Sequence, residues 1–359
     1  MPTKIKVVLF EDTVQTRSEI LQALTKHLGS DGSVIPFDGS KFTESPADKE
    51  RTYEIRLESI LMKAPYDSAT IIVADRDLSK SQDSQFGGLS VNAVDAVSKN
   101  LAIPICSYAR EPEPDDYDWR GKWREGHIVL RFSDGIDELA RRAVIAARGF
   151  AEIAAQLSDS KATGSPAKIL AKLLGKPEYS AKMALYSVGD HNRLPEVLAK
   201  DKDNWVQRMT HFLGYWLWDS LLRYPGLFVN EVAAASHLNI DTDDFGESEV
   251  GAIFEEALYK GPFADPKKPL WWRGMLDDIV SRENFADGLE LVQKKVKSTI
   301  KRSKCCVEPS KSAGYYCIIS RVCPTRLTAR SGQIWWIMEA PAKIGDGLVN
   351  LDRVLPSFL

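Results

Sequence analysis

IIVADRDL, residues 71–78, is a short apolar run that ends abruptly in acids. Its first four residues are apolar or small and three of them are β-branched, which is typical of a strand buried on both faces in a parallel sheet covered by helices. Such a strand delivers Asp75 to its carboxyl end. Ligands of open α/β sheets bind at that end, so Asp75 is a candidate for chemistry.

A second acidic strand end lies near the N-terminus, where the apolar run at residues 6–10 stops at Glu11 and Asp12. If the two strands are neighbours, Glu11, Asp12 and Asp75 converge in one pocket. Converging carboxylates raise one another's pKa unless a cation lies between them, and all-oxygen ligation favours a hard ion such as Mg²⁺. The alternative is that each acid only caps the helix that follows it.

Several short matches, in the right order over residues 4–156, resemble the receiver domain of two-component response regulators. Phe10-Glu11-Asp12 resembles the acidic pair that holds Mg²⁺ in receivers, and residues 74–78 resemble the phosphoacceptor segment, with Asp75 as the acceptor. Residues 87–89 resemble the turn into the next helix, residues 103–109 the fourth strand and residues 132–139 the entry to the fifth helix.

The resemblance implies a flavodoxin-like, doubly wound parallel sheet. It also implies a phosphoacceptor group and a set of metal ligands around it. The first comprises Asp75, with Ser107 and Arg131 as contacts of the phosphoryl group, and the second comprises Glu11, Asp12, Asp75 and Asp77.

Three features depart from the receiver pattern. Receivers carry a lysine just before a proline at the end of the fifth strand, and residues 127–132 contain neither. Arg131 could supply the positive charge, but it is a longer, planar donor. Bulky Tyr108 follows Ser107 where receivers have a small residue, and residues 111–126 form an acidic and aromatic insertion.

The whole chain has 359 residues, 44% of them hydrophobic, which is enough for two domains. Its 47 basic and 50 acidic side chains give a net charge of −3, which does not indicate a nucleic-acid or membrane-surface partner. No apolar run approaches the length of a membrane span, and the first residues lead into a strand without a signal-peptide core. We therefore expect a cytoplasmic protein.

A small, polar stretch closed by a proline, residues 158–166, predicts the linker between the domains. We expect a receiver-like domain at residues 1–157 and a separate α+β domain at 167–359, helical over 167–304 and β-rich over 305–359. The amphipathic helix predicted at 134–157 is longer than a compact receiver needs. It could pair with a second copy in a homodimer or connect the two domains.

The second half offers few chemical signals, and no catalytic constellation is recognisable, so we do not expect an enzyme. Residues 229–240 superficially resemble a helix-turn-helix, but the surrounding residues are acidic and include no Lys or Arg, which argues against DNA binding. The basic run at 294–304 predicts an amphipathic helix beginning near Leu289, whose cationic face is either solvated or a site for an acidic partner or nucleic acid. Four cysteines between 305 and 323 lack zinc spacing and are expected to be ordinary thiols.

Two functions from different classes are consistent with these features. In the first, a partner histidine kinase transfers phosphate to Asp75, and the protein controls signalling through its second domain or buffers phosphate, by analogy in a bacterial signalling or defence system. In the second, the domain is a pseudo-receiver that holds a protein partner without phosphotransfer. The carboxylate trio favours the first function, and the missing lysine favours the second.

Overall fold

The computed structural model describes residues 4–42, 52–78, 86, 89–109, 128–159, 164–186, 204–223 and 226–303. By their contacts the residues form two compact units. The first comprises Met1–Leu217 with Gly261–Phe263, and the second comprises Trp218–Lys260 with Ala264–Leu359. No helix in the described ranges combines the length and the apolar character that crossing a membrane requires.

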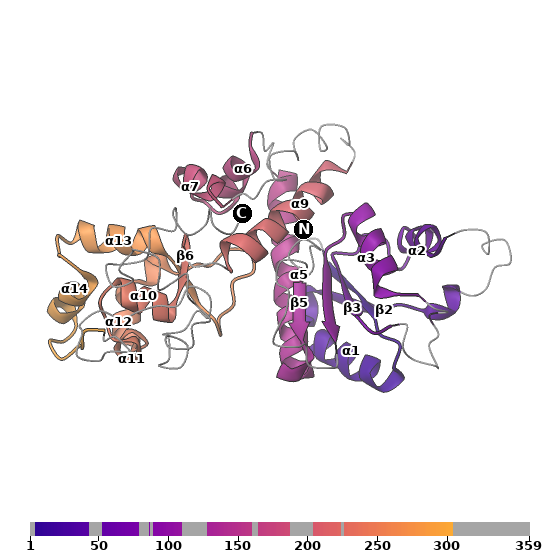
Figure 1. Ribbon diagram of the computed structural model, residues 1–359, viewed down its shortest axis with the longest axis horizontal. Helices are drawn as coiled ribbons and strands as arrows, with labels where there is room; N and C mark the ends of the chain where they lie inside the picture. Colours follow the sequence, from indigo (N-terminus) through magenta and orange to yellow (C-terminus); the bar gives the residue numbers. More distant parts are fainter. Residues whose placement is uncertain are drawn as a thin grey trace, which may run out of the picture. The chain divides into compact units, whose positions relative to one another are not determined.

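The first unit is built on a five-stranded sheet with the order β2-β1-β3-β4-β5, in which every neighbouring pair is parallel (Figure 1). The strands are β1 (Ile5–Phe10), β2 (Gly32–Pro36), β3 (Ile71–Asp75), β4 (Ile105–Ala109) and β5 (Ile128–Arg131). This order is that of flavodoxin-like doubly wound sheets. The predicted α/β class and parallel sheet are therefore confirmed.

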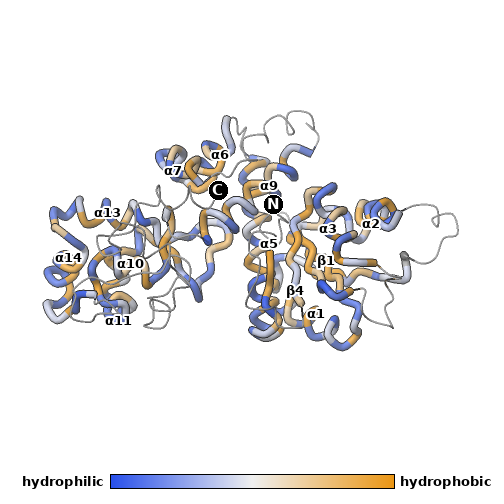
Figure 2. The backbone as a smooth tube through the Cα atoms, viewed as in Figure 1, coloured by the Kyte–Doolittle hydropathy of each residue, from blue (hydrophilic) through white to orange (hydrophobic). Residues whose placement is uncertain are grey.

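Helices cover both faces of this sheet because both faces of its central strands are apolar (Figure 2). The helices are α1 (Val14–Leu28), α2 (Tyr53–Leu61), α3 (Val91–Asn100) and α5 (Ile136–Asp159). Alternate strand residues such as Phe10, Ile72 and Ala74 form one core with α2 and α3. The residues between them, such as Leu9 and Val73, are buried on the other face, where α1 and α5 pack together.

Among the residues that the structure describes, the first unit also includes the helices α6 (Pro166–Leu173), α7 (Ser180–Ala184) and α9 (Trp205–Tyr215). The α9 helix packs closely on α5 because Gly214 leaves room for the ring of Phe150, which meets Tyr215 edge to face at 5.4 Å. The Tyr215 hydroxyl accepts a hydrogen bond from the Ile105 amide at the start of β4 (2.7 Å). The contacts thus divide the chain at Leu217 and Trp218, whereas the predicted linker at 158–166 lies between α5 and α6.

The second unit contains a two-stranded antiparallel sheet of β6 (Phe228–Asn230) and β7 (Leu270–Trp272). Its aromatic core includes Phe228, whose ring lies 4.3 Å from Trp272 and 4.7 Å from Tyr259. Its helices are α10 (Glu231–His237), α11 (Thr242–Phe245), α12 (Ser248–Ile253), α13 (Arg273–Arg282) and α14 (Gly288–Lys295). The predicted β-rich stretch at 305–359 and its cysteines lie outside the described residues.

The helix predicted over the basic run is shorter than expected, because α14 ends at Lys295. The residues beyond it use their backbone groups to pair with the turn after α10. The Lys301 carbonyl accepts from the Asp241 amide (2.9 Å), and the Ser303 amide donates to the Asn239 carbonyl (3.0 Å). A helix would use these groups internally, so the continuous amphipathic helix does not form.

Candidate metal centre

The acids named from the sequence lie at the carboxyl edge of two neighbouring strands. Glu11 and Asp12 follow β1 directly, and Asp75 is the last residue of β3. Phe10 pairs with Ala74 in the parallel register, which brings Glu11 level with Asp75. The chain passes from β1 outward to β2 and then returns to β3, so this edge is the topological switch point where doubly wound sheets bind ligands.

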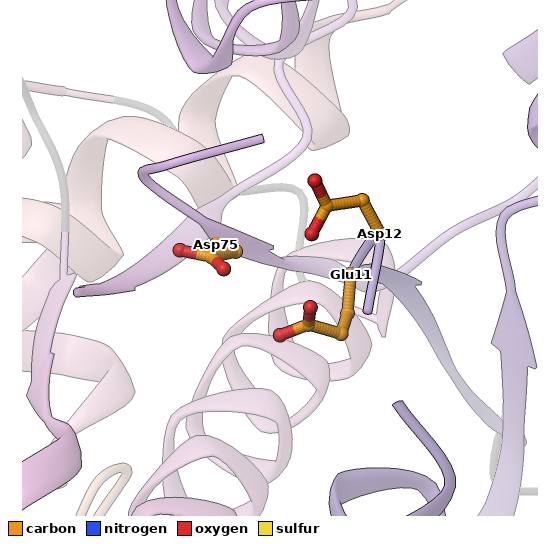
Figure 3. A group of neighbouring side chains, drawn as sticks. All are labelled: Glu11, Asp12 and Asp75. Atoms are coloured by element: carbon orange, nitrogen blue, oxygen red, sulfur yellow. The ribbon is translucent and has the colours of Figure 1, made fainter. Parts of the chain in front are cut away.

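Glu11, Asp12 and Asp75 form one buried cluster. A carboxylate oxygen from each lies within 4.8 Å of the others, and the residues are 0%, 6% and 1% exposed. Figure 3 shows the side chains directed toward a common space between the two strand ends. The predicted convergence of these carboxylates is therefore confirmed, and the group could hold a metal ion.

Helix capping does not explain these acids. The N-cap residue of α1 is Thr13, and the N-cap of α3, the helix after β3, is Ser90, whose side chain accepts from the Ala93 amide. Asp75 instead accepts a hydrogen bond at Oδ1 from the Asp77 amide (2.9 Å). The capping alternative is therefore wrong for Asp75, and neither Glu11 nor Asp12 is the cap of α1.

The donor set suits a hard divalent cation. Ionised carboxylates this close repel one another, and burial removes the water that would screen them, so a cation between them stabilises the charged forms. Carboxylate oxygens are the ligands that Mg²⁺, Ca²⁺ and Mn²⁺ prefer. The side chains of this cluster therefore fit the metal that the receiver resemblance implies.

Asp77 does not join the cluster among the described residues. It lies in the turn after β3, where its backbone amide donates a hydrogen bond to Asp75 Oδ1. Asp77 thus orients Asp75 through its main chain, and its predicted role as a metal ligand stays a prediction.

The structure does not bring Ser107 into the cluster either. Ser107 is buried on β4, but it pairs with Ala74, and Tyr108 pairs with Asp75. Because side chains alternate along a strand, Ser107 lies on the sheet face opposite to Asp75. The contact of Ser107 with a phosphoryl group on Asp75 therefore stays a prediction.

Arg131 lies at the end of β5, beyond the level of the cluster. It pairs with Ala109, whereas Leu130 pairs with Tyr108 and so lies level with Asp75. The Arg131 side chain is exposed and makes no hydrogen bond or ion pair within the described ranges. Its predicted contact with a phosphoryl group stays a prediction.

The residue that the sequence analysis did not assign to the site is Tyr108. It is fully buried, and its hydroxyl donates a hydrogen bond to Glu11 Oε2 (2.8 Å). The opposite oxygen, Glu11 Oε1, accepts from the Thr13 amide (2.8 Å). The strand register identifies it, because pairing of Ile72 with Ile105 places Tyr108 beside Asp75, and the local sequence does not set that register.

Three cations of the basic run pair with acids of the second unit. Lys295 pairs with Glu283 (2.8 Å) and Lys297 with Glu247 (2.5 Å), and Arg302 lies 3.4 Å from Asp287. Cations neutralised by acids of the same unit are poor ligands for phosphates, since their partners must first be displaced. Within the described part of the run, the solvated-face interpretation is favoured over an acidic partner.

Comparison of the chain with protein-family models and with curated proteins finds no match. The fold and the site therefore define the class of protein by themselves. The first unit is an α/β unit with a five-stranded parallel sheet of flavodoxin-like order and a buried acidic cluster at its switch point.

Proposed function

We propose that the first unit is a receiver-type phosphoacceptor that takes a phosphoryl group from a partner histidine kinase onto Asp75. The observation that supports this function is the position of Asp75. It ends a central strand at the switch point and lies in a buried cluster with the two acids that follow the neighbouring strand. The receiver resemblance predicts this arrangement from the same residues.

In this proposal a carboxylate oxygen of Asp75 attacks the phosphorus of a phosphohistidine. The new oxygen–phosphorus bond forms as the phosphorus–nitrogen bond breaks, and the imidazole leaves with the electron pair. The Asp77 amide orients the attacking carboxylate. Glu11, Asp12 and Asp75 would hold Mg²⁺, which when bound supplies positive charge that offsets the charge on the phosphoryl oxygens.

In one form of the proposal, the second unit is the output or docking domain. In the other, the protein only absorbs phosphate from its kinase, as a buffer in a signalling or defence system would. Ser107 and Arg131 remain the proposed contacts of the phosphoryl group. DNA binding by the second unit is disfavoured, because the residues around the segment 229–240 are acidic and three cations of the basic run, Lys295, Lys297 and Arg302, are paired with acids.

A second candidate function is supported by the end of β5. The residue level with Asp75 there is Leu130, and the neighbouring Arg131 is exposed. A unit that keeps the fold and the acidic cluster without the lysine of a receiver would serve as a pseudo-receiver, a module that binds a protein partner without phosphotransfer.

Intact-protein mass after incubation with Mg²⁺ and a small phosphodonor such as acetyl phosphate separates the two functions. We expect the wild type to gain one phosphoryl group, removable by alkaline hydroxylamine as an acyl phosphate is. Asp75→Asn should gain none. Asp137→Asn is the matched control and should be modified, because Asp137 lies outside the acidic cluster and pairs with Lys26 and His27. No added mass in the wild type with any donor would contradict the phosphoacceptor function and leave the pseudo-receiver.

A further inference from the structure

Tyr108 is held firmly at the edge of the acidic cluster. It pairs with Asp75 across the β3–β4 register and is fully buried. Its ring stacks on Phe132 with the centroids 6.0 Å apart and the planes at 25°. Its hydroxyl donates to Glu11 Oε2 at 2.8 Å. The ring and the hydroxyl are thus both fixed, so Tyr108 is a rigid donor.

Glu11 is consequently restrained at both of its oxygens. The Thr13 amide donates to Oε1 and the Tyr108 hydroxyl donates to Oε2, each at 2.8 Å. A carboxylate held at both ends cannot rotate freely. In the cluster at least one oxygen of each acid lies near those of the other two. Each Glu11 oxygen keeps a second lone pair for an ion, but turning the carboxylate until both oxygens face one ion would weaken at least one of these buried hydrogen bonds.

Divalent cations differ in whether they bind one or both oxygens of a carboxylate. Mg²⁺ is octahedral, takes one oxygen from each of a few carboxylates and keeps several waters. Ca²⁺ takes six to eight oxygens and commonly uses bidentate carboxylates. A Glu11 carboxylate whose orientation is fixed by two hydrogen bonds therefore suits the smaller ion, which takes one oxygen and needs no such turn, better than the larger one.

We propose that Tyr108 is a positioning residue that makes the acidic cluster select Mg²⁺ over Ca²⁺ by fixing Glu11. This inference rests on the cation site of the proposed function, and it adds the residue that sets the selectivity of that site. Hydrogen-bond donors that orient metal ligands commonly contribute ten- to a hundredfold to metal affinity.

The test is isothermal titration of the full chain with MgCl₂ and, separately, with CaCl₂. The variants are Tyr108→Phe, which removes only the hydroxyl, and Tyr66→Phe as the matched control. Tyr66 is also buried, and its hydroxyl accepts from the Asp38 amide (2.9 Å), but it lies in the core with α2 and α3 on the other sheet face. We expect Tyr108→Phe to reduce the ratio of the Ca²⁺ to the Mg²⁺ dissociation constant about tenfold. Tyr66→Phe should leave this ratio unchanged.

A parallel loss of affinity for both ions in Tyr108→Phe, with the ratio unchanged, would overturn the inference while leaving the cation site intact. A wild type that binds neither ion would overturn the cation site itself, and the inference with it. If Tyr108→Phe does not fold, the same ratio of dissociation constants is measured for Glu11→Asp. It keeps the charge but withdraws the carboxylate from Tyr108 by one methylene, so the ratio should fall in the same direction, and an unchanged ratio would overturn the inference.

Discussion

The buried carboxylate of Asp75 destabilises the folded protein when no cation is bound. Its carboxylate is buried with those of Glu11 and Asp12 inside a 4.8 Å group, where like charges raise one another's free energy. Sites that bind ions commonly retain such unfavourable arrangements, because the ion supplies the compensation. The stability of the unit should therefore depend on the charge of this one residue.

Asp75→Asn removes one of these charges while keeping a carbonyl oxygen that can accept from the Asp77 amide. We expect it to raise the free energy of unfolding by about 1–2 kcal/mol in EDTA, since it relieves repulsion. Saturating Mg²⁺ should stabilise the wild type more than the variant. Urea unfolding with and without Mg²⁺ measures both effects. A variant less stable than the wild type in EDTA would show that the carboxylate is stabilising without a cation.

His211 on α9 gives the first unit a dependence on pH. Burial lowers its pKa to about 4, with Lys99 contributing in the same direction. Its ring meets Tyr215 edge to face at 4.8 Å. The folded pKa lies below the unfolded value of 6.5, so the unfolded chain binds more protons between these values. The stability that neutral His211 contributes is therefore present above about pH 6.5 and is lost as the pH falls toward 4.

The corresponding variant is His211→Gln, which does not titrate. Between pH 7.5 and 5 the wild type should lose up to about 2 kcal/mol more of its unfolding free energy than the variant. Asp219, whose pKa burial raises to about 7, has the opposite sign, and its contribution is lost as the pH rises through 7. Both proteins contain Asp219, so its effect cancels in the difference. Equal losses in the two proteins would contradict the role of His211.

The residues of the site were predictable to different degrees from the sequence. Glu11, Asp12 and Asp75 could be named because each directly follows or ends an apolar run, and parallel strands end at a common edge. The places of Ser107 and Arg131 depend on how β4 and β5 are aligned with β3. A shift of one residue moves a side chain to the other face of the sheet. The local sequence of these strands does not set that alignment, which is why Tyr108 was not assigned to the site.

At the scale of elements, the contact between α5 and α9 depends on small residues. A Cβ added to Gly214 would lie 2.1 Å from the Phe150 ring, and one added to Gly149 would lie 2.1 Å from the Phe263 ring. Both contacts involve aromatic rings that also pack against each other, with Phe150 and Phe263 5.1 Å apart. The rings therefore have little freedom to move, and these glycines set the distance between the elements.

Gly214→Ala should accordingly destabilise the protein by about 1–3 kcal/mol, because overpacking outweighs the better helix propensity of alanine. Gly251→Ala on α12 is the matched control, since nothing lies within 4 Å of its added Cβ. The control should be neutral or stabilising by up to about 1 kcal/mol. Thermal and urea unfolding measure both. Equal effects of the two variants would contradict close packing at Gly214.

The type of most elements followed from the sequence, but their partners did not. The apolar and aromatic spacing predicts a helix at α9, yet the residues it packs against, such as Phe150, are distant in sequence, so its membership of the first unit is not visible there. The basic run shows the converse. Its periodicity predicts a helix, but pairing of its backbone with Asn239 and Asp241 ends the helix at Lys295.

At the scale of the whole molecule, the acidic cluster lies entirely within the first unit. A cation that binds only the folded form stabilises it by an amount set by its concentration, about 2.7 kcal/mol at a hundred times the dissociation constant. Because the contacts divide the chain into two compact units, we expect this stabilisation to be confined to the unit that holds the ion. An effect on the second unit would require a further step. In the proposed function, that step is phosphorylation of Asp75.

Hydrogen exchange of the full chain, followed by peptide mass, distinguishes these steps. Mg²⁺ alone should slow exchange in β1, β3 and β4 and leave α10, α13 and α14 unchanged. Addition of a phosphodonor should then alter exchange in the second unit if that unit is the output, and should not do so if the protein buffers phosphate. Asp75→Asn is the control and should remove the phosphodonor response. Protection of the second unit by Mg²⁺ alone would contradict a cation effect confined to the first unit, because only a cooperative coupling of the units would transmit it there.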